Sequence, residues 1–193
     1  KPFKPSGLAF GSVIHSAIEW FHKERIKGRQ VTLEKLQKIF ETDWFAQRIE
    51  TEIQFKDSED ELKLLLTGKE MLGMYFQNPV GEIKGAEVPF SVPLINPVNG
   101  EDLGINIEGI FDLVEKDDSI VEFKTSGQTM NAQDVNEHLQ LTIYSYADGV
   151  RTGRETRQVL LKPNTRQTLR LSQKLSVEQT RSFSVVVNAP RDD

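Results

Sequence analysis

Apolar residues recur at helical spacing near the start of the chain. Between Ser12 and Lys27 they form one stripe, which predicts an amphipathic helix with Ile14, Ala17, Ile18 and Phe21 on its inner face. At 100° per residue, His15 lies about 110° from the centre of this stripe, on an edge shared with Glu19 and His22. His15 is therefore predicted beside the core rather than in it.

Two more helices are predicted before residue 80. One covers residues 33–47, and the other runs from a capping box at Ser58 and Glu61 to the stop at Asn78-Pro79. The acidic stretch 50–61 between them is predicted to be a solvated loop and helix start.

After Pro79 the pattern changes to the one typical of strands, predicted over residues 82–95, 103–115, 119–126, 157–163 and 166–172. A helix over 134–149 separates the third strand from the fourth, with an inner stripe of Val135, Leu139, Ile143 and Tyr146. This order predicts an α/β fold, a three-layer-like sandwich with a central mixed sheet of about five strands flanked by helices. No linker interrupts the pattern. We therefore expect a single domain over residues 1–193, mainly helical over 1–80 and with the sheet over 81–175.

The composition limits the classes of site that the chain can form. Its 193 residues, 37% hydrophobic and 27% charged, are ordinary for one globular domain. The absence of cysteine excludes disulfides, thiolate zinc sites and iron–sulfur clusters, so a metal would need His, carboxylate or carbonyl ligands. No apolar run approaches the roughly 18 residues of a membrane span. We expect a cytoplasmic protein that needs no membrane.

The charge is unevenly distributed. The chain carries −5 in total, whereas residues 150–174 hold seven basic residues and one acid, a net charge of +6 that leaves −11 for the rest. The basic residues are Arg151, Arg154, Arg157, Lys162, Arg166, Arg170 and Lys174. Such a segment is either a surface that meets a polyanion or a solvated face.

The stretch GIFDLVEKDDSIVEFKTS at 109–126 reads as a hairpin with charged residues inside its apolar runs. If the loop consists of the three residues 116–118, residues whose numbers add up to 234 are paired across the two strands. Asp112 then lies opposite Glu122, with Cβ atoms about 5 Å apart. Two such carboxylates repel by about 3 kcal/mol at an effective dielectric near 20. Lys124 would offset part of this repulsion, and a divalent cation bound by both carboxylates would replace the repulsion with attraction. The alternative is a solvated sheet face near a turn.

The helix that follows the hairpin has a polar flank of its own. Gln140 and Tyr144 are four residues apart on one edge, displaced by about 100–140° from the predicted apolar stripe, as His15 is on the first helix. The alternatives are an ordinary hydrogen bond within the helix for this pair and a surface histidine for His15.

The order of these features along the chain adds to their meaning. They run Gly11-x-x-x-His15, Asp112, Glu122-Phe123-Lys124 and Gln140-x-x-x-Tyr144. In this order, over roughly residues 7–163, they resemble the PD-(D/E)XK nuclease superfamily, specifically its RecB-like exonuclease branch. Asp112 follows Phe111 rather than the proline common in the superfamily. The cysteines that flank this module in iron–sulfur members are absent, which excludes a cluster but not nuclease chemistry.

The resemblance implies a metal-dependent DNA nuclease with a restriction-endonuclease-like core. Asp112, Glu122, the backbone carbonyl of Phe123 and His15 would hold Mg²⁺ or Mn²⁺. Lys124 would orient or deprotonate the attacking water, while Gln140 and Tyr144 would brace Lys124 or contact DNA. The candidate phosphate contacts are Arg151, Arg154, Lys162, Arg166 and Arg170.

The resemblance favours an exonuclease in DNA repair, recombination, or phage or defence DNA processing. It leaves open the polarity, exo or endo action, the preferred strandedness, and whether a helicase or recombinase partner is needed. One rival is a catalytically silent nucleic-acid-binding or interaction module with the same fold. Another is a glycosidase carboxylate pair, but that chemistry has no use for Lys124 and needs a cleft rich in aromatics, whereas the chain has two Trp.

Overall fold

The computed structural model describes residues 3–57, 59–96, 98–125 and 138–153, and the backbone of 156–161 and 181–187. Apart from two short strands, the first part of the chain is helical, and strands and a further helix follow, which confirms the predicted mixed α/β class. The chain divides into two compact units. Unit 1 comprises Lys1–Ile83, Lys124–Gln128 and Asn188–Asp193, and unit 2 comprises Lys84–Phe123 and Thr129–Val187. The single domain over residues 1–193 stays a prediction.

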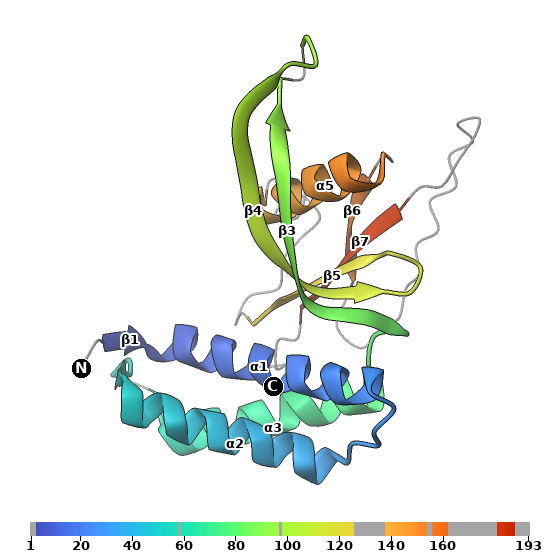
Figure 1. Cartoon of the computed structure of the whole chain (residues 1–193). Helices are drawn as coiled ribbons and strands as arrows, with labels where there is room; N and C mark the ends of the chain where they lie inside the picture. Colours follow the sequence, from blue (N-terminus) through green and yellow to red (C-terminus); the bar gives the residue numbers. More distant parts are fainter. Residues whose placement is uncertain are drawn as a thin grey trace. The chain divides into compact units, whose positions relative to one another are not determined.

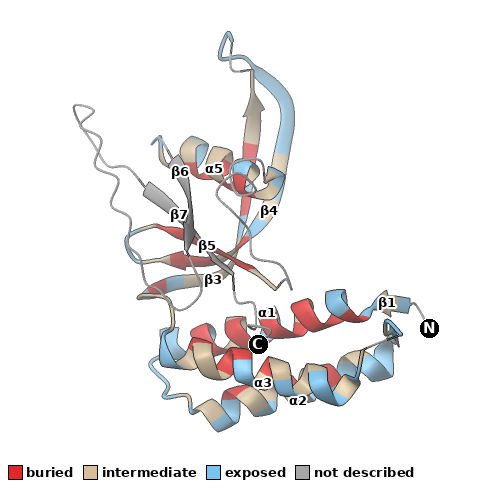
Figure 2. Cartoon of the chain, turned by 180° about the vertical axis from the view of Figure 1, so that it is seen from behind, coloured by how far each residue is buried: buried red, intermediate tan, exposed pale blue. Residues whose placement is uncertain are grey.

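Three helices build unit 1 (Figure 1): α1 (Ser6–Ile26), α2 (Leu33–Glu50) and α3 (Glu61–Gln77). All three were predicted, and α1 begins six residues earlier than expected. Its predicted inner stripe is confirmed, because Ile14, Ala17, Ile18 and Phe21 are all buried. Buried residues follow α1 along its length in Figure 2. No helix in the described part of the chain has the length and apolar character needed to cross a membrane.

The helices α2 and α3 approach closely at a glycine. A Cβ atom added to Gly68 would lie 2.2 Å from the ring of Phe40, so any larger residue at 68 would displace that ring. The Phe40 ring in turn meets Phe10 of α1 edge-on, with ring centroids 6.1 Å apart. The aromatic contact thus links all three helices of unit 1.

Two local predictions between α2 and α3 were wrong. The cap of α3 is Asp60, whose side chain accepts a hydrogen bond from the backbone N–H of Leu62 at 2.9 Å. The predicted cap, Ser58, lies outside the described residues. The predicted loop also contains the short strand β2 (Glu52–Gln54), which pairs in parallel with β1 (Phe3–Pro5). Strands of three residues are too short to show a two-residue period.

His22 is buried instead of lying on the predicted edge of α1. It is 1% exposed, and its Nε2 is hydrogen-bonded to the Tyr75 hydroxyl of α3 at 2.5 Å. Because α3 packs on this side of α1, the buried face of α1 is wider than the stripe seen in the sequence. Burial, with a smaller effect of Arg25, lowers the pKa of His22 from 6.5 to about 3.

We expect His22 to make the fold acid-sensitive. Its folded pKa lies below its unfolded value, so its stabilisation is complete above pH 6.5 and is lost as the pH falls towards about 3. One such group contributes up to about 1.4 kcal/mol of unfolding free energy per pH unit. In urea unfolding between about pH 7 and pH 4, His22→Gln should flatten this dependence. An unchanged slope in His22→Gln would contradict the assignment.

Unit 2 is built on strands β3 (Ile83–Ile95), β4 (Asp102–Glu115), β5 (Ile120–Lys124), β6 (Thr156–Leu161) and β7 (Arg181–Val187). They are hydrogen-bonded in the order β3-β4-β5-β7-β6. The pair β4–β5 is antiparallel and the pair β6–β7 is parallel, so the sheet is mixed. The strand β7 was not predicted, and the strand predicted at 166–172 lies outside the described residues.

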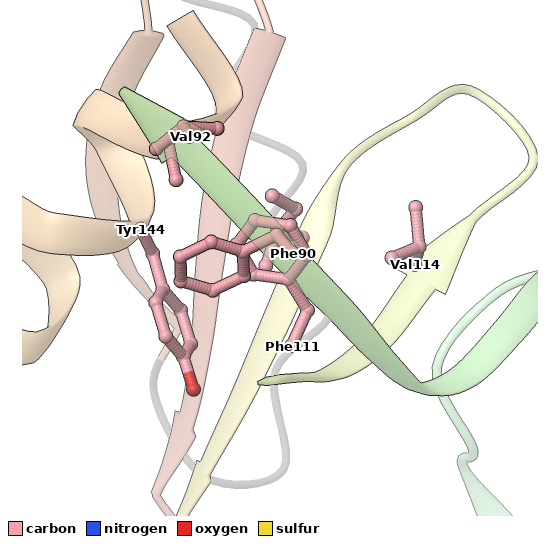
Figure 3. Close-up of a cluster of buried hydrophobic side chains, with 7 residues drawn as sticks. Phe90, Val92, Phe111, Val114 and Tyr144 are labelled. Atoms are coloured by element: carbon pink, nitrogen blue, oxygen red, sulfur yellow. The ribbon is translucent and has the colours of Figure 1, made fainter. Parts of the chain in front are cut away.

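The inner stripe predicted for the helix α5 (Leu139–Thr152) is confirmed in part, because Ile143 and Tyr146 are partly buried and pack against the core of unit 2. Leu139, predicted to face inward, is 72% exposed, whereas the buried residues are Leu141, Tyr144, Ala147 and Asp148. Val135 lies outside the described residues. Figure 3 shows the Tyr144 ring beside Phe90 and Phe111, which stack with ring centroids 4.4 Å apart. Tyr144 is therefore part of the core of unit 2.

A second tyrosine of α5 ties this helix to β3, which lies at one end of the strand order. The Tyr146 hydroxyl donates a hydrogen bond to the carbonyl of Pro93 and accepts one from the N–H of Ile95, both at 2.7 Å. One hydroxyl thus satisfies two backbone groups of the edge strand.

Candidate metal-dependent nuclease site

The pairing of β4 with β5 follows the predicted register. Leu113 pairs with Val121 and Val114 pairs with Ile120, so paired positions sum to 234 as expected. The next position along the ladder would bring Asp112 and Glu122 to the same face. The predicted register is therefore confirmed over these pairs, and the facing of Asp112 and Glu122 beyond them stays a prediction.

The turn that sets this register is the predicted loop of three residues. The N–H of Glu115 donates to the carbonyl of Ser119 at 2.8 Å, and this bond closes the loop. Its third residue, Asp118, has a φ of +72°, and aspartate tolerates this left-handed conformation better than most residues. The length of the loop and the aspartate at its left-handed position both fit the predicted register.

The Asp112 side chain changes the ladder at the site. Its Oδ2 accepts a hydrogen bond from the backbone N–H of Phe123 at 2.9 Å. By the register, a regular ladder would give this N–H to the backbone of Phe111. The carboxylate is thus fixed in orientation by the neighbouring strand.

Glu122 and Lys124 occupy alternate positions at the end of β5. Glu122 is only 3% exposed, and Lys124, half-buried, is the last residue of the strand. Residues two apart in a strand share a face, so both side chains leave β5 on the side that also carries Asp112. A buried acid needs compensation by hydrogen bonds or by a cation.

Tyr144 connects this face to α5. Its hydroxyl donates to the carbonyl of Ile110 in β4 and accepts from Nε2 of Gln140 at 3.0 Å. Burial raises the pKa of Tyr144 above its ordinary value, and the negative charges of Glu122 and then Asp112 raise it further. Both carboxylates therefore act electrostatically on one hydroxyl.

This arrangement corrects the predicted polar flank of α5. Tyr144 lies in the core rather than beside it, and its hydrogen bond with Gln140 is the ordinary one that the sequence left open. Sequence reasoning missed the Ile110 carbonyl as the partner of Tyr144. No side-chain pattern signals a backbone acceptor.

His15 belongs to unit 1, whereas Asp112 and Glu122 belong to unit 2. Among the residues that the structure describes, no group of three or more His, Cys, Asp or Glu side chains is arranged to hold a metal ion. The ligand role of His15 stays a prediction.

Gly11, which precedes His15 by one turn, is a glycine because of close packing. A Cβ there would lie 2.6 Å from Oγ1 of Thr125, in the same unit.

Only one of the predicted DNA-contacting residues lies in the part of the chain whose side chains are described. Arg151 forms an ion pair with Asp148 at 3.1 Å and lies over the Phe111 ring, 5.3 Å from its centroid. These contacts anchor it to the core of unit 2. The predicted contacts outside the described residues are Arg154, Lys162, Arg166 and Arg170.

The comparison with protein families tests the resemblance seen in the sequence. A family model described as the PD-(D/E)XK nuclease superfamily matches residues 1–187. The chain belongs to the PD-(D/E)XK nuclease superfamily. A search of curated proteins found no match.

The residues of this PD-(D/E)XK hairpin suit the divalent metals that such nucleases typically use. Asp112 and Glu122 offer hard carboxylate oxygens on one face, and Glu122 is buried where its charge is poorly solvated. The negative charge of both acids reaches Tyr144, so the region is electronegative. The donor set therefore fits Mg²⁺ or Mn²⁺.

Proposed function

We propose that this PD-(D/E)XK protein is a Mg²⁺- or Mn²⁺-dependent deoxyribonuclease of the RecB-like branch, and that it acts as an exonuclease. The observation that carries the proposal is the register of the β4–β5 hairpin, whose continuation would place Asp112 opposite Glu122, with Lys124 two residues after Glu122. We infer that the mixed sheet and its helices form the restriction-endonuclease-like core of such an enzyme.

The acids and the lysine take separate roles in this proposal. Asp112, Glu122, the backbone carbonyl of Phe123 and the His15 imidazole hold the ion. When bound, the ion would lower the pKa of a water molecule and neutralise charge on the scissile phosphate. Lys124 orients or deprotonates that water.

The remaining residues position this machinery. The N–H of Phe123 holds the Asp112 carboxylate, and Tyr144, with Gln140 bonded to its hydroxyl, holds the backbone of β4 at Ile110. These contacts support bracing, rather than DNA contact, as the role of Tyr144. A fixed carboxylate costs little reorganisation during the reaction.

We assign the binding of DNA to the basic segment 150–174, through Arg151, Arg154, Lys162, Arg166 and Arg170. Its net charge of +6 suits the phosphate backbone. DNA repair, recombination, and phage or defence DNA processing are the settings that we propose, with a helicase or recombinase as a partner.

The direct test is cleavage of end-labelled linear DNA and of circular DNA with Mg²⁺, Mn²⁺ or EDTA. We expect linear DNA to be degraded from an end, circular DNA to stay intact and EDTA to stop the reaction. Mn²⁺ should support cleavage at least as well as Mg²⁺, because the imidazole of His15 suits Mn²⁺ better. Cleavage of circles would indicate an endonuclease. Binding without cleavage would favour the silent binding module.

A further inference from the structure

Four large apolar side chains lie exposed on one face of unit 1. We call them the apolar quartet: Phe45 and Ile49 of α2, and Leu62 and Leu66 of α3, each between 53% and 65% exposed. Within each helix the two residues are four apart and therefore lie on one stripe. Single exposed apolar residues are ordinary, whereas a contiguous set marks a surface that binds something.

Ion pairs between the two helices bring the two stripes together. Arg48 of α2 pairs with Glu61 of α3 at 2.7 Å, and Glu41 pairs with Lys69 further along. The helices are thus antiparallel, and the turn around Arg48 faces the turn around Glu61. The quartet occupies these same turns, with one stripe on each side of the seam between α2 and α3.

The quartet faces away from α1. Two of the α2 residues that meet α1 are Phe40 and Trp44, both in edge contact with Phe10. At 100° per residue, the stripe of Phe45 and Ile49 lies about 140° around α2 from them. On α3, the stripe of Leu62 and Leu66 lies on the side opposite Tyr75, which contacts α1 through His22. The quartet is therefore the outer surface of the helix pair.

The negative charge of the connection beside the quartet indicates what charge its partner carries. The connection from Glu50 to Asp60 carries five acids and one base, Lys56, and it joins the ends of α2 and α3 nearest the quartet. Four of these acids are exposed: Glu50, Glu52, Asp57 and Asp60. DNA would be repelled by this end.

We propose that the apolar quartet is a docking surface for an amphipathic helix of another protein, with basic residues at the end of that helix that meets the acidic connection. Apolar side chains at helical spacing pack between the two stripes, as in other recognition of a helix by a groove. The lysines or arginines of the partner face the exposed acids and set its direction. The quartet includes none of the residues assigned to DNA cleavage.

A designed helix can probe this surface. The probe is a fluorescent peptide of about 16 residues, with leucines at three- and four-residue spacing and lysines in its last turn. A control peptide carries glutamates in place of the lysines. Fluorescence anisotropy should show that the lysine peptide binds the whole chain at least about tenfold more tightly than the glutamate peptide.

Variants localise the binding. The double variant Phe45→Ser/Leu66→Ser should bind the lysine peptide at least about tenfold more weakly, because two apolar anchors are lost. Its melting temperature, followed by circular dichroism, should equal that of wild type. Val98→Ser removes an apolar side chain that is 92% exposed in unit 2 and should bind as wild type. Equal binding of both peptides, or wild-type binding by the double variant, would overturn the proposal. So would sedimentation showing a dimer that the double variant converts to monomer, since the occupant would then be a second copy.

Discussion

Lys124→Ala should slow DNA cleavage by about a hundredfold or more while metal affinity stays the same or rises. The Lys124 side chain leaves β5 on the same face as Glu122, two residues away. In the proposed mechanism it acts on the attacking water and is not a metal ligand. Its removal takes away no ligand and removes one positive charge close to a bound cation. Isothermal titration with Mn²⁺ and single-turnover cleavage at saturating metal separate the two effects.

The matched control is Lys116→Ala. Lys116 is a lysine of the same hairpin, but it lies in the loop between β4 and β5. The Lys116→Ala variant should cleave DNA as fast as wild type. If Lys124→Ala also cleaves as fast as wild type, the hairpin is not a catalytic centre, and the silent binding module takes its place.

Glu122→Gln should lose metal binding and cleavage together, and Asp112→Asn should behave in the same way. Each replacement keeps the shape of the side chain but removes a charged ligand. We expect metal affinity to fall by more than about tenfold to a hundredfold, which is the range for losing a residue that only supports a ligand. Cleavage at limiting metal should fall at least as far.

The same variants should make the metal-free protein more stable. Glu122 is 3% exposed, and both acids act on the Tyr144 hydroxyl, so neutralising either acid should relieve desolvation or repulsion. For a chain of this size each kcal/mol gained raises the melting temperature by about 2–4 °C. The control is Glu108→Gln, an exposed acid on β4, which should change neither melting nor metal affinity. A lower metal-free melting temperature in both variants would contradict the electrostatic account.

The hairpin was predictable because its determinants are local. A three-residue loop with aspartate at its left-handed position fixes the register, and the register fixes which acids face each other. The bond from the Phe123 N–H to Asp112 was not predictable. It depends on the exact separation of the two strands, which the alternation of residues does not encode.

Tyr144 and His22 were misplaced for a common reason. Both side chains have a large ring and a polar atom, so counting them as polar put each beside the apolar stripe. In the fold each ring is buried, and each polar atom meets a partner from another element: the Ile110 carbonyl for Tyr144 and Tyr75 for His22. A pattern along one helix does not contain the partner that makes such burial favourable.

At high protein concentration, an unpaired strand at the end of a sheet is where chains can join into fibrils. The strand β3 lies at such an end, yet its edge offers few groups to a newcomer. Pro89 and Pro93, on the same side of the strand, have no N–H, and the Tyr146 hydroxyl already occupies the carbonyl of Pro93 and the N–H of Ile95. A neighbouring chain would meet an incomplete set of hydrogen-bonding groups, so this edge resists cross-β stacking and amyloid growth.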